Sequence, residues 1–148
     1  MSENEVARQI VDAAYRVHTI LGPGLLESVY EAALAYELEK RGLRFSRQQA
    51  IPVVYDAVRI QTGFHADLVV EGEVIVEIKA LEAIAPVHKK QLLTYLKLAD
   101  KGLLINFNVP HLKDGIKRMV VQRPELQRSQ KSKQLQQLTL NLSVTSCP

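Results

Sequence analysis

The sequence has little of several residue types that mark special classes of protein. Its 148 residues include one cysteine, Cys147, no tryptophan, and 5% aromatic side chains. A single cysteine excludes an intramolecular disulfide, and no group of cysteine and histidine has the spacing of a zinc site. This usage favours a reducing compartment. The scarcity of aromatic residues argues against a stacking platform for single-stranded nucleic acid.

Long apolar runs are also missing. No stretch approaches the roughly 20 apolar residues that a membrane-spanning helix needs. The first five residues are polar and acidic, unlike the basic start and apolar core of a signal peptide. We therefore expect a cytoplasmic protein with no membrane partner. The 47% hydrophobic and 24% charged residues, in a chain of this length, are typical of one globular domain.

The net charge of +3 is unevenly distributed along the chain. Residues 1–112 carry 12 basic and 14 acidic side chains, whereas residues 113–133 carry seven basic and two acidic ones. This basic segment could contact phosphates, or it could be a solvated tail. We expect one domain over residues 1–121, followed by a polar and basic C-terminal tail over residues 122–148 whose composition also fits disorder.

Hydrophobic spacing predicts two helices at the start of the chain. Residues 5–21 place apolar side chains at intervals of three and four, and the Gly-Pro-Gly run at residues 22–24 then interrupts the pattern. A second helix is predicted over residues 25–41, because helical spacing resumes there and Gly42 stands where a C-terminal cap belongs.

The pattern then changes to that of strands. Three strands are predicted over residues 51–55, 64–70 and 73–80. The last two would form a hairpin that turns around Glu71-Gly72. A third helix is predicted over residues 86–99, followed by strands at residues 103–107 and 115–121. The order α-α-β-β-β-α-β predicts an α/β fold with a mixed sheet flanked by helices.

One strand carries residues suited to chemistry on phosphates. Glu77 and Lys79 are two apart, so their side chains project from the same face of the strand. Asp67, on the preceding strand, could reach the same place. Two carboxylates on neighbouring strands suit Mg²⁺, which prefers oxygen ligands. The alternative is a simple ion pair between Glu77 and Lys79 on an exposed sheet face.

The turn of the hairpin decides whether the two carboxylates can meet. With a two-residue turn, Ala66 faces Glu77 and Asp67 points to the opposite face, because a slip of one residue inverts every side chain. Convergence requires an odd loop, such as Glu71-Gly72-Glu73, or a bulge near Asp67. We predict one of these two arrangements.

Several motifs along residues 5–120 occur in the order typical of one family. The segment GLLESVY at residues 24–30 fits the pattern G-x-x-E-x-x-Y. It is followed by DLVV at 67–70, VIVEIKA at 74–80, His88, QLLTYL at 91–96 and LINFN at 104–108. On these motifs the chain resembles the GxxExxY family, grouped with the PD-(D/E)xK nuclease-like superfamily. The resemblance implies a PD-(D/E)xK nuclease-like core over residues 1–121.

The resemblance also implies a catalytic site that binds Mg²⁺ or Mn²⁺. Asp67 and Glu77 correspond to the motif acids that hold the metal, and Lys79 corresponds to the motif lysine. Glu27 resembles the helix carboxylate that completes the metal site in related nucleases. Without the resemblance, a glutamate at this position is more often simply a first-turn carboxylate that interacts favourably with the helix dipole.

Four further residues are implied in substrate contact or in organising the site. Gln91 and Tyr95 resemble a Q-x-x-x-Y motif that contacts DNA in some nuclease families. His88 lies on the same helical stripe, and Tyr30 shares a helix face with Glu27. The alternative for His88, Gln91 and Tyr95 is a buried hydrogen-bond network.

The function implied is a metal-dependent nuclease that hydrolyses phosphodiester bonds of DNA or RNA. The alternative from another class is a non-catalytic nucleic-acid-binding or protein-interaction module that kept the nuclease scaffold, because fold alone does not establish function. Nucleic acid is the expected partner. A homodimer is a further option, by analogy with small nucleases that pair to cut both strands.

Overall fold

The computed structural model describes residues 1–95 and 101–120. The predicted tail at residues 122–148 and the end of the predicted third helix lie outside the described residues. Along the chain the elements are α1 (Glu3–Leu21), α2 (Glu27–Lys40), β1 (Phe45–Ala50), β2 (Val53–Tyr55), β3 (Val58–Ile60), β4 (His65–Val70), β5 (Val74–Lys79), α3 (Pro86–Tyr95), β6 (Lys101–Asn106), the short 3₁₀ helix η2 (Leu112–Asp114) and β7 (Ile116–Val120).

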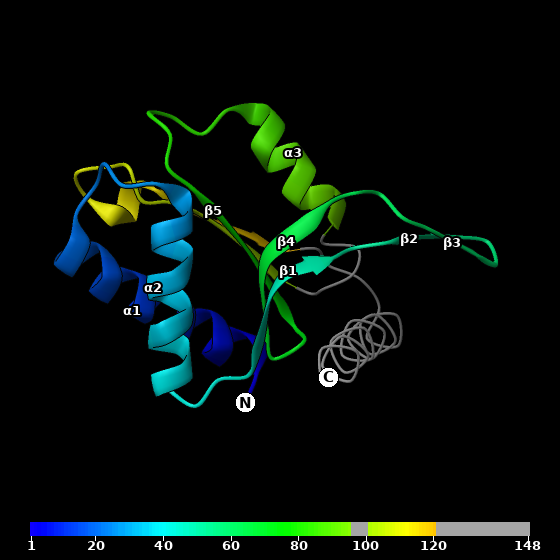
Figure 1. Ribbon diagram of the computed structural model, residues 1–148, viewed down its shortest axis with the longest axis horizontal. Helices are drawn as coiled ribbons and strands as arrows, with labels where there is room; N and C mark the ends of the chain where they lie inside the picture. Colours follow the sequence, from blue (N-terminus) through cyan, green and yellow to red (C-terminus); the bar gives the residue numbers. More distant parts are fainter. Residues whose placement is uncertain (96–100, 121–148) are drawn as a thin grey trace.

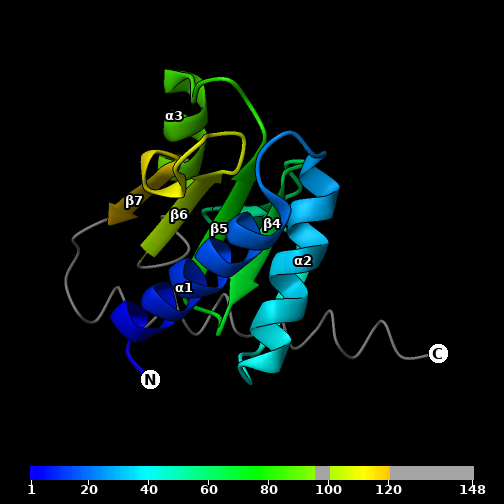
Figure 2. The ribbon, with the colours of Figure 1, turned by 90° about the vertical axis from the view of Figure 1, so that its left-hand side faces the viewer.

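Capping residues define both ends of the first helix, α1. The Ser2 hydroxyl accepts a hydrogen bond from the Glu5 amide at 3.3 Å, and the Ser2 amide donates to Glu5 Oε2 at 3.1 Å. This reciprocal pair is a capping box. The helix ends at Gly22, whose φ of +69° is in the region that favours glycine. Figure 2 shows α1 and α2 lying together in front of the sheet.

Five strands form one mixed sheet in the order β1-β4-β5-β6-β7. All neighbouring pairs are antiparallel except β5 and β6, which are parallel and are joined through α3. Helices α1 and α2 cover one face of the sheet and α3 covers the other (Figure 1). The predicted α/β fold with a mixed sheet is confirmed.

Each face of the sheet carries its own apolar cluster. The larger cluster joins α1 and α2 to the sheet, with Ile10, Leu34 and Leu38 fully buried against strand residues such as Val76 and Ile78. The smaller cluster lies under α3 and includes Leu92, Ile75 and Leu104. Successive side chains of β5 therefore point alternately into the two clusters, because neighbouring residues of a strand face opposite sides of the sheet.

The strands before the hairpin differ from the prediction. The segment predicted at residues 51–55 contains β2, which pairs with β3 in a separate two-stranded sheet. This ribbon projects away from the body of the protein (Figure 1). The first strand of the main sheet is β1, which was not predicted. Its sequence FSRQQA has few β-branched residues and no alternation of apolar and polar side chains, so the strand signal is weak.

Within the described part of the chain, no helix combines the length and the apolar character that crossing a membrane requires.

The connection between β6 and β7 leaves no room for a side chain at Gly115. The Asn106 amide donates to the Gly115 carbonyl at 2.8 Å. A Cβ at Gly115 would collide with the Asn106 carbonyl oxygen and would lie 3.0 Å from Val109 Cγ2. We expect Gly115→Ala to lower the free energy of unfolding by about 1–3 kcal/mol or more, because backbone must move.

Urea denaturation of the two proteins measures this cost. Gly63→Ala is the matched control, since a Cβ at Gly63 meets nothing within 4 Å. Its only expected cost is the backbone strain of an alanine at the φ of +76°. A Gly115→Ala variant that is as stable as the wild type would contradict the close approach of the two backbones.

Candidate functional site

The loop between β4 and β5 places the two motif acids opposite each other. The pair nearest the loop is Val70 with Val74, so the loop has three residues, 71–73. The same register puts Asp67 opposite Glu77. Of the two arrangements predicted from the sequence, an odd loop or a bulge near Asp67, the structure has the odd loop. The two carboxylates therefore approach from neighbouring strands.

Backbone pairing between β4 and β5 ends before Asp67 and Glu77, and their carboxylates accept hydrogen bonds from backbone amides of the opposite strand. Backbone pairing ends with Leu68 and Val76. Beyond it, the Asp67 amide donates to Glu77 Oε1 at 3.1 Å, and the Ile78 amide donates to Asp67 Oδ2 at 2.7 Å. Each acid is thus held by the backbone of the other strand, in the opening where the two strands separate.

Burial disfavours the ionised form of Glu77. Its side chain is nearly enclosed, and the pKa of Glu77 is raised from 4.5 to about 8, mainly by desolvation. The negative charge of Asp67 is the second cause of this rise, and that of Glu27 is a smaller one. The hydrogen bond from the Asp67 backbone and the positive charge of Lys79 act in the opposite direction. The pair of acids therefore lacks a compensating positive charge beyond that of Lys79.

The chain after Lys79 is fixed by a buried asparagine. Lys79 lies two residues beyond Glu77 on β5, on the same face. Its carbonyl accepts from the Phe107 amide at 3.0 Å. Asn106, which is buried, donates through Nδ2 to the Leu81 carbonyl at 2.7 Å and accepts from the Leu81 amide at 3.0 Å. This role of Asn106 was not predicted from the sequence, although a polar residue at the end of an apolar strand was a signal.

Glu27 reaches the same end of β5 from the first turn of α2. Its Oε1 accepts a hydrogen bond from the Ala80 amide at 3.2 Å, immediately after Lys79. The side chain is exposed, unlike the buried Glu77. Glu27 thus lies beside the pair of acids, but its carboxylate is engaged with backbone and does not join them in a common cluster.

Tyr30 fixes the turn that precedes Glu27. The side chain is fully buried and stacks on Phe107 with ring centroids 4.6 Å apart. Its hydroxyl donates to the Gly22 carbonyl at 2.6 Å and accepts from the Leu25 amide at 3.1 Å. The tyrosine of the GLLESVY segment therefore closes the turn between α1 and α2 and sets where α2 begins.

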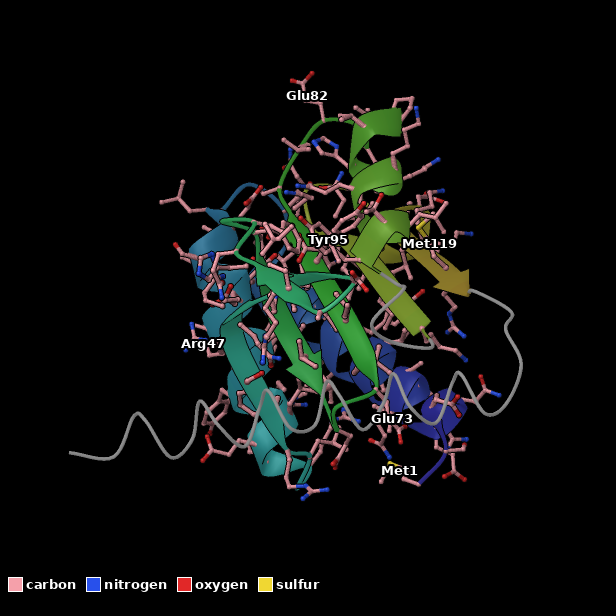
Figure 3. All side chains as sticks on the ribbon, turned by 90° about the vertical axis from the view of Figure 1, so that its right-hand side faces the viewer. Met1, Arg47, Glu73, Glu82, Tyr95 and Met119 are labelled. Carbon is pink, nitrogen blue, oxygen red and sulfur yellow. The ribbon has the colours of Figure 1, made fainter. Side chains whose placement is uncertain are left out.

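A second acid of α2, Glu31, was not considered in the sequence argument. It follows Glu27 by four residues, so the two share a helix face. Glu31 is buried, and its Oε2 lies 3.1 Å from both Nε and NH2 of Arg47. Figure 3 labels Arg47 on the side of the molecule where β1 passes α2. The spacing of four residues was the available signal for Glu31.

The three candidates on α3 differ in their surroundings. His88 Nδ1 accepts from the Ala85 amide at 3.1 Å, which caps the start of the helix. Tyr95 stacks on Phe64 with ring centroids 3.8 Å apart, and Figure 3 shows it over the sheet. Gln91 is exposed to solvent. The helix thus uses His88 and Tyr95 in contacts within the protein and leaves Gln91 available to a partner.

The donor atoms at the site suit a hard divalent cation only in part. Asp67 and Glu77 bring two carboxylates together from neighbouring strands, and carboxylate oxygens are the ligands that such an ion prefers. Among residues 1–95 and 101–120, however, no group of three or more His, Cys, Asp or Glu side chains is arranged to hold a metal. The third predicted ligand, Glu27, would have to leave the Ala80 amide to join the pair.

Comparison with known proteins gives one match. The family model of the PD-(D/E)XK nuclease superfamily matches residues 4–119, which include Glu27, Asp67, Glu77 and Lys79. No curated protein and no solved structure matches. The three helices and the five-stranded mixed sheet agree with a PD-(D/E)XK nuclease core, so the predicted fold class is confirmed.

The raised pKa of Glu77 predicts how stability depends on pH. The folded protein keeps this proton up to about pH 8, whereas an ordinary glutamate releases it near pH 4.5. The contribution to stability is therefore complete below pH 4.5 and is lost as pH rises toward 8, by at most about 1.4 kcal/mol per pH unit. In the presence of a chelator, we expect Tm to fall between pH 6 and pH 8.5.

The Glu77→Gln variant should show a shallower fall, because the amide cannot ionise. Thermal unfolding followed by circular dichroism measures both slopes. Glu82→Gln is the matched control, since Glu82 is exposed on the loop before α3 (Figure 3) and should keep the wild-type slope. Equal slopes for Glu77→Gln and the wild type would contradict the burial argument.

The contacts of the Tyr30 hydroxyl predict a cost for removing it. Tyr30→Phe keeps the stacking on Phe107 but leaves two backbone groups without their partner, so we expect a loss of about 1–3 kcal/mol in the free energy of unfolding. Tyr36→Phe is the control, because Tyr36 is 62% exposed and its change should stay within about 0.5 kcal/mol. Chemical denaturation compares the two variants, and equal small effects would argue against the closed turn.

Proposed function

Because this chain belongs to the PD-(D/E)XK nuclease superfamily, we propose that it is a metal-dependent nuclease that hydrolyses phosphodiester bonds of DNA or RNA. The observation that carries the proposal is the meeting of Asp67 and Glu77 at the open end of the β4–β5 ladder. Lys79 follows on the same face of β5, so two acids and one lysine border a single opening between strands.

Asp67 and Glu77 would hold Mg²⁺ or Mn²⁺, and Glu27 would complete the set from α2. When bound, such an ion supplies positive charge to the scissile phosphate and lowers the pKa of bound water. Glu77 would serve as a ligand in its ionised form, and the positive charge of the ion would offset the repulsion between Glu77 and Asp67. The hydrogen bonds that the two strands make to these acids limit how far either carboxylate can turn.

Lys79 would place its positive charge against the phosphate whose bond is cleaved. The carbonyl of Lys79 and the backbone of Leu81 are both tied to β6, so the base of this side chain is held while the flexible ammonium end adjusts. A preorganised cation of this kind stabilises the negative charge that develops in the transition state. Lys79 would thus complement the acids and would not compete with them for the ion.

The nucleic acid would lie across the face that carries α3. Gln91 is exposed there together with Lys89 and Lys90, and the helix has no acidic residue in its first turn. On β7, exposed Lys117 alternates with Ile116 and so lies on the same face as Met119, which packs in the cluster under α3, and it adds positive charge to this face. His88, Tyr95 and Tyr30 would organise the elements around the site through the contacts described above.

Within the superfamily, we assign the chain to the GxxExxY group. The support is the role that each motif residue has in this chain. Tyr30 closes the turn, and Glu27 contacts the strand that carries Glu77 and Lys79. A cytoplasmic location and pairing into a homodimer complete the proposal, on composition and on the analogy with paired nucleases respectively.

A non-catalytic nucleic-acid-binding or protein-interaction module is the second candidate. One observation favours it: the described residues contain no ready group of three metal-binding side chains. In addition, Glu27, Asp67 and Glu77 each accept a hydrogen bond from a backbone amide. Such a module would bind nucleic acid in a salt-dependent manner, without cleavage and without a need for divalent ions.

A cleavage assay separates the two candidates. The purified chain with Mg²⁺ or Mn²⁺ is expected to cut at least one of a set of labelled DNA and RNA substrates that are single-stranded, duplex or branched. Asp67→Asn and Lys79→Ala should each lower the rate by about 10²-fold or more, since each removes charge that acts in the transition state.

Glu82→Gln serves as the control for this assay and should cleave as the wild type does. A chelator should stop the wild-type reaction. Binding that is unaffected by the chelator, with no cleavage of any substrate, would select the non-catalytic module instead.

A further inference from the structure

Gln48 interrupts the strand that lies beside Asp67. In the β1–β4 register, Gln49 pairs with Ala66, which leaves Gln48 opposite Asp67 at the one step where the ladder lacks a pair. The φ of Gln48 is +51°, in the left-handed region that a side chain other than glycine seldom adopts. Such a conformation costs free energy and persists only where its surroundings hold it.

The amide group of Gln48 lies between two carboxylates. Its Nε2 donates to Asp67 Oδ1 at 3.0 Å and also to Glu31 Oε1. The second oxygen of Asp67 accepts from the Ile78 amide at 2.7 Å. Both oxygens of Asp67 are therefore fixed, one by Gln48 and one by backbone. Glu31 is in turn held by the guanidinium of Arg47, so Gln48 is anchored at its far side.

The chemistry of an amide suits this position better than a charged group would. A lysine here would neutralise Asp67 and would oppose the binding of a cation. A carboxylate would add a third negative charge and repel both neighbours. The amide donates two hydrogen bonds and leaves the negative charge of Asp67 available. Partners of this kind, which orient a ligand without touching the ion, tune metal sites in general.

We propose that Gln48 is a positioning residue for Asp67, held in a left-handed conformation by Glu31 and acting through the orientation of the Asp67 carboxylate. The proposal rests on the proposed function, since it takes Asp67 to be a metal ligand. It adds two residues, Gln48 and Glu31, to the set that determines whether the site can bind a divalent ion.

The test measures Mn²⁺ affinity, stability and cleavage in the same variants. Gln48→Gly accepts the positive φ and removes only the amide, so its Tm in a chelator should stay close to that of the wild type. Its affinity for Mn²⁺, followed by electron paramagnetic resonance of the free ion, should fall by about 10- to 100-fold. Asp56→Gly is the matched control, because Asp56 has a φ of +55° in the exposed turn of the β2–β3 ribbon.

Two substitutions at Glu31 should weaken Mn²⁺ binding to different extents. Glu31→Gln can still accept a hydrogen bond from Gln48 and should weaken Mn²⁺ binding less than Glu31→Ala, which leaves Gln48 without its anchor. If Gln48→Gly does not fold, Gln48→Asn decides the question, because asparagine tolerates a positive φ but is too short to span both carboxylates.

The outcomes distinguish this proposal from the function on which it rests. Weakened Mn²⁺ binding in Gln48→Gly, with Asp56→Gly unchanged, supports the positioning role even if no substrate is cut. Wild-type affinity in Gln48→Gly, or in Gln48→Asn where that variant decides, overturns it while cleavage by the wild type stands. A wild-type protein that neither binds Mn²⁺ nor cleaves overturns both.

Discussion

Two acidic side chains facing each other where the β4–β5 ladder opens are the constraint around which this structure is arranged. Glu77 is buried, which disfavours its negative charge, and the hydrogen bond from the Asp67 amide offsets only part of this cost. Such a pair weakens the fold on its own account. Its presence in the centre of the sheet is therefore an argument for a role in binding, because polar groups that cost stability are usually found at functional sites.

Contacts between distant parts of the chain hold the elements around Asp67 and Glu77 in place. Tyr30 ties the start of α2 to the α1–α2 turn and to Phe107, and Asn106 ties the end of β5 to β6. Neither contact uses an oxygen of Asp67 or Glu77. Rigid surroundings of this kind limit the movement of a site to the side chains themselves.

Elements with strong local patterns were predictable from the sequence, and features that depend on distant contacts were not. The helices and the β4–β5 hairpin follow from periodicity, and the three-residue loop is one of the two arrangements predicted from requiring Asp67 to meet Glu77. Strand β1 was missed because FSRQQA has no strand pattern of its own and is defined by its pairing with β4. Glu31 and Gln48 lie outside the motifs, and the roles of Glu31, Gln48 and Asn106 depend on contacts with distant parts of the chain.

Hydrogen bonds link the two chain segments that connect the β2–β3 ribbon to the main sheet. The Ile51 amide bonds the Phe64 carbonyl at 3.0 Å, and the Thr62 hydroxyl bonds the Ile51 carbonyl at 2.8 Å. These bonds join the two ends of the excursion, so the spacing of β1 and β4 does not depend on how far the ribbon extends. The tip at Asp56 is therefore a place where evolution or an experimenter could lengthen the chain, or graft a recognition sequence, without shifting Gln48 against Asp67.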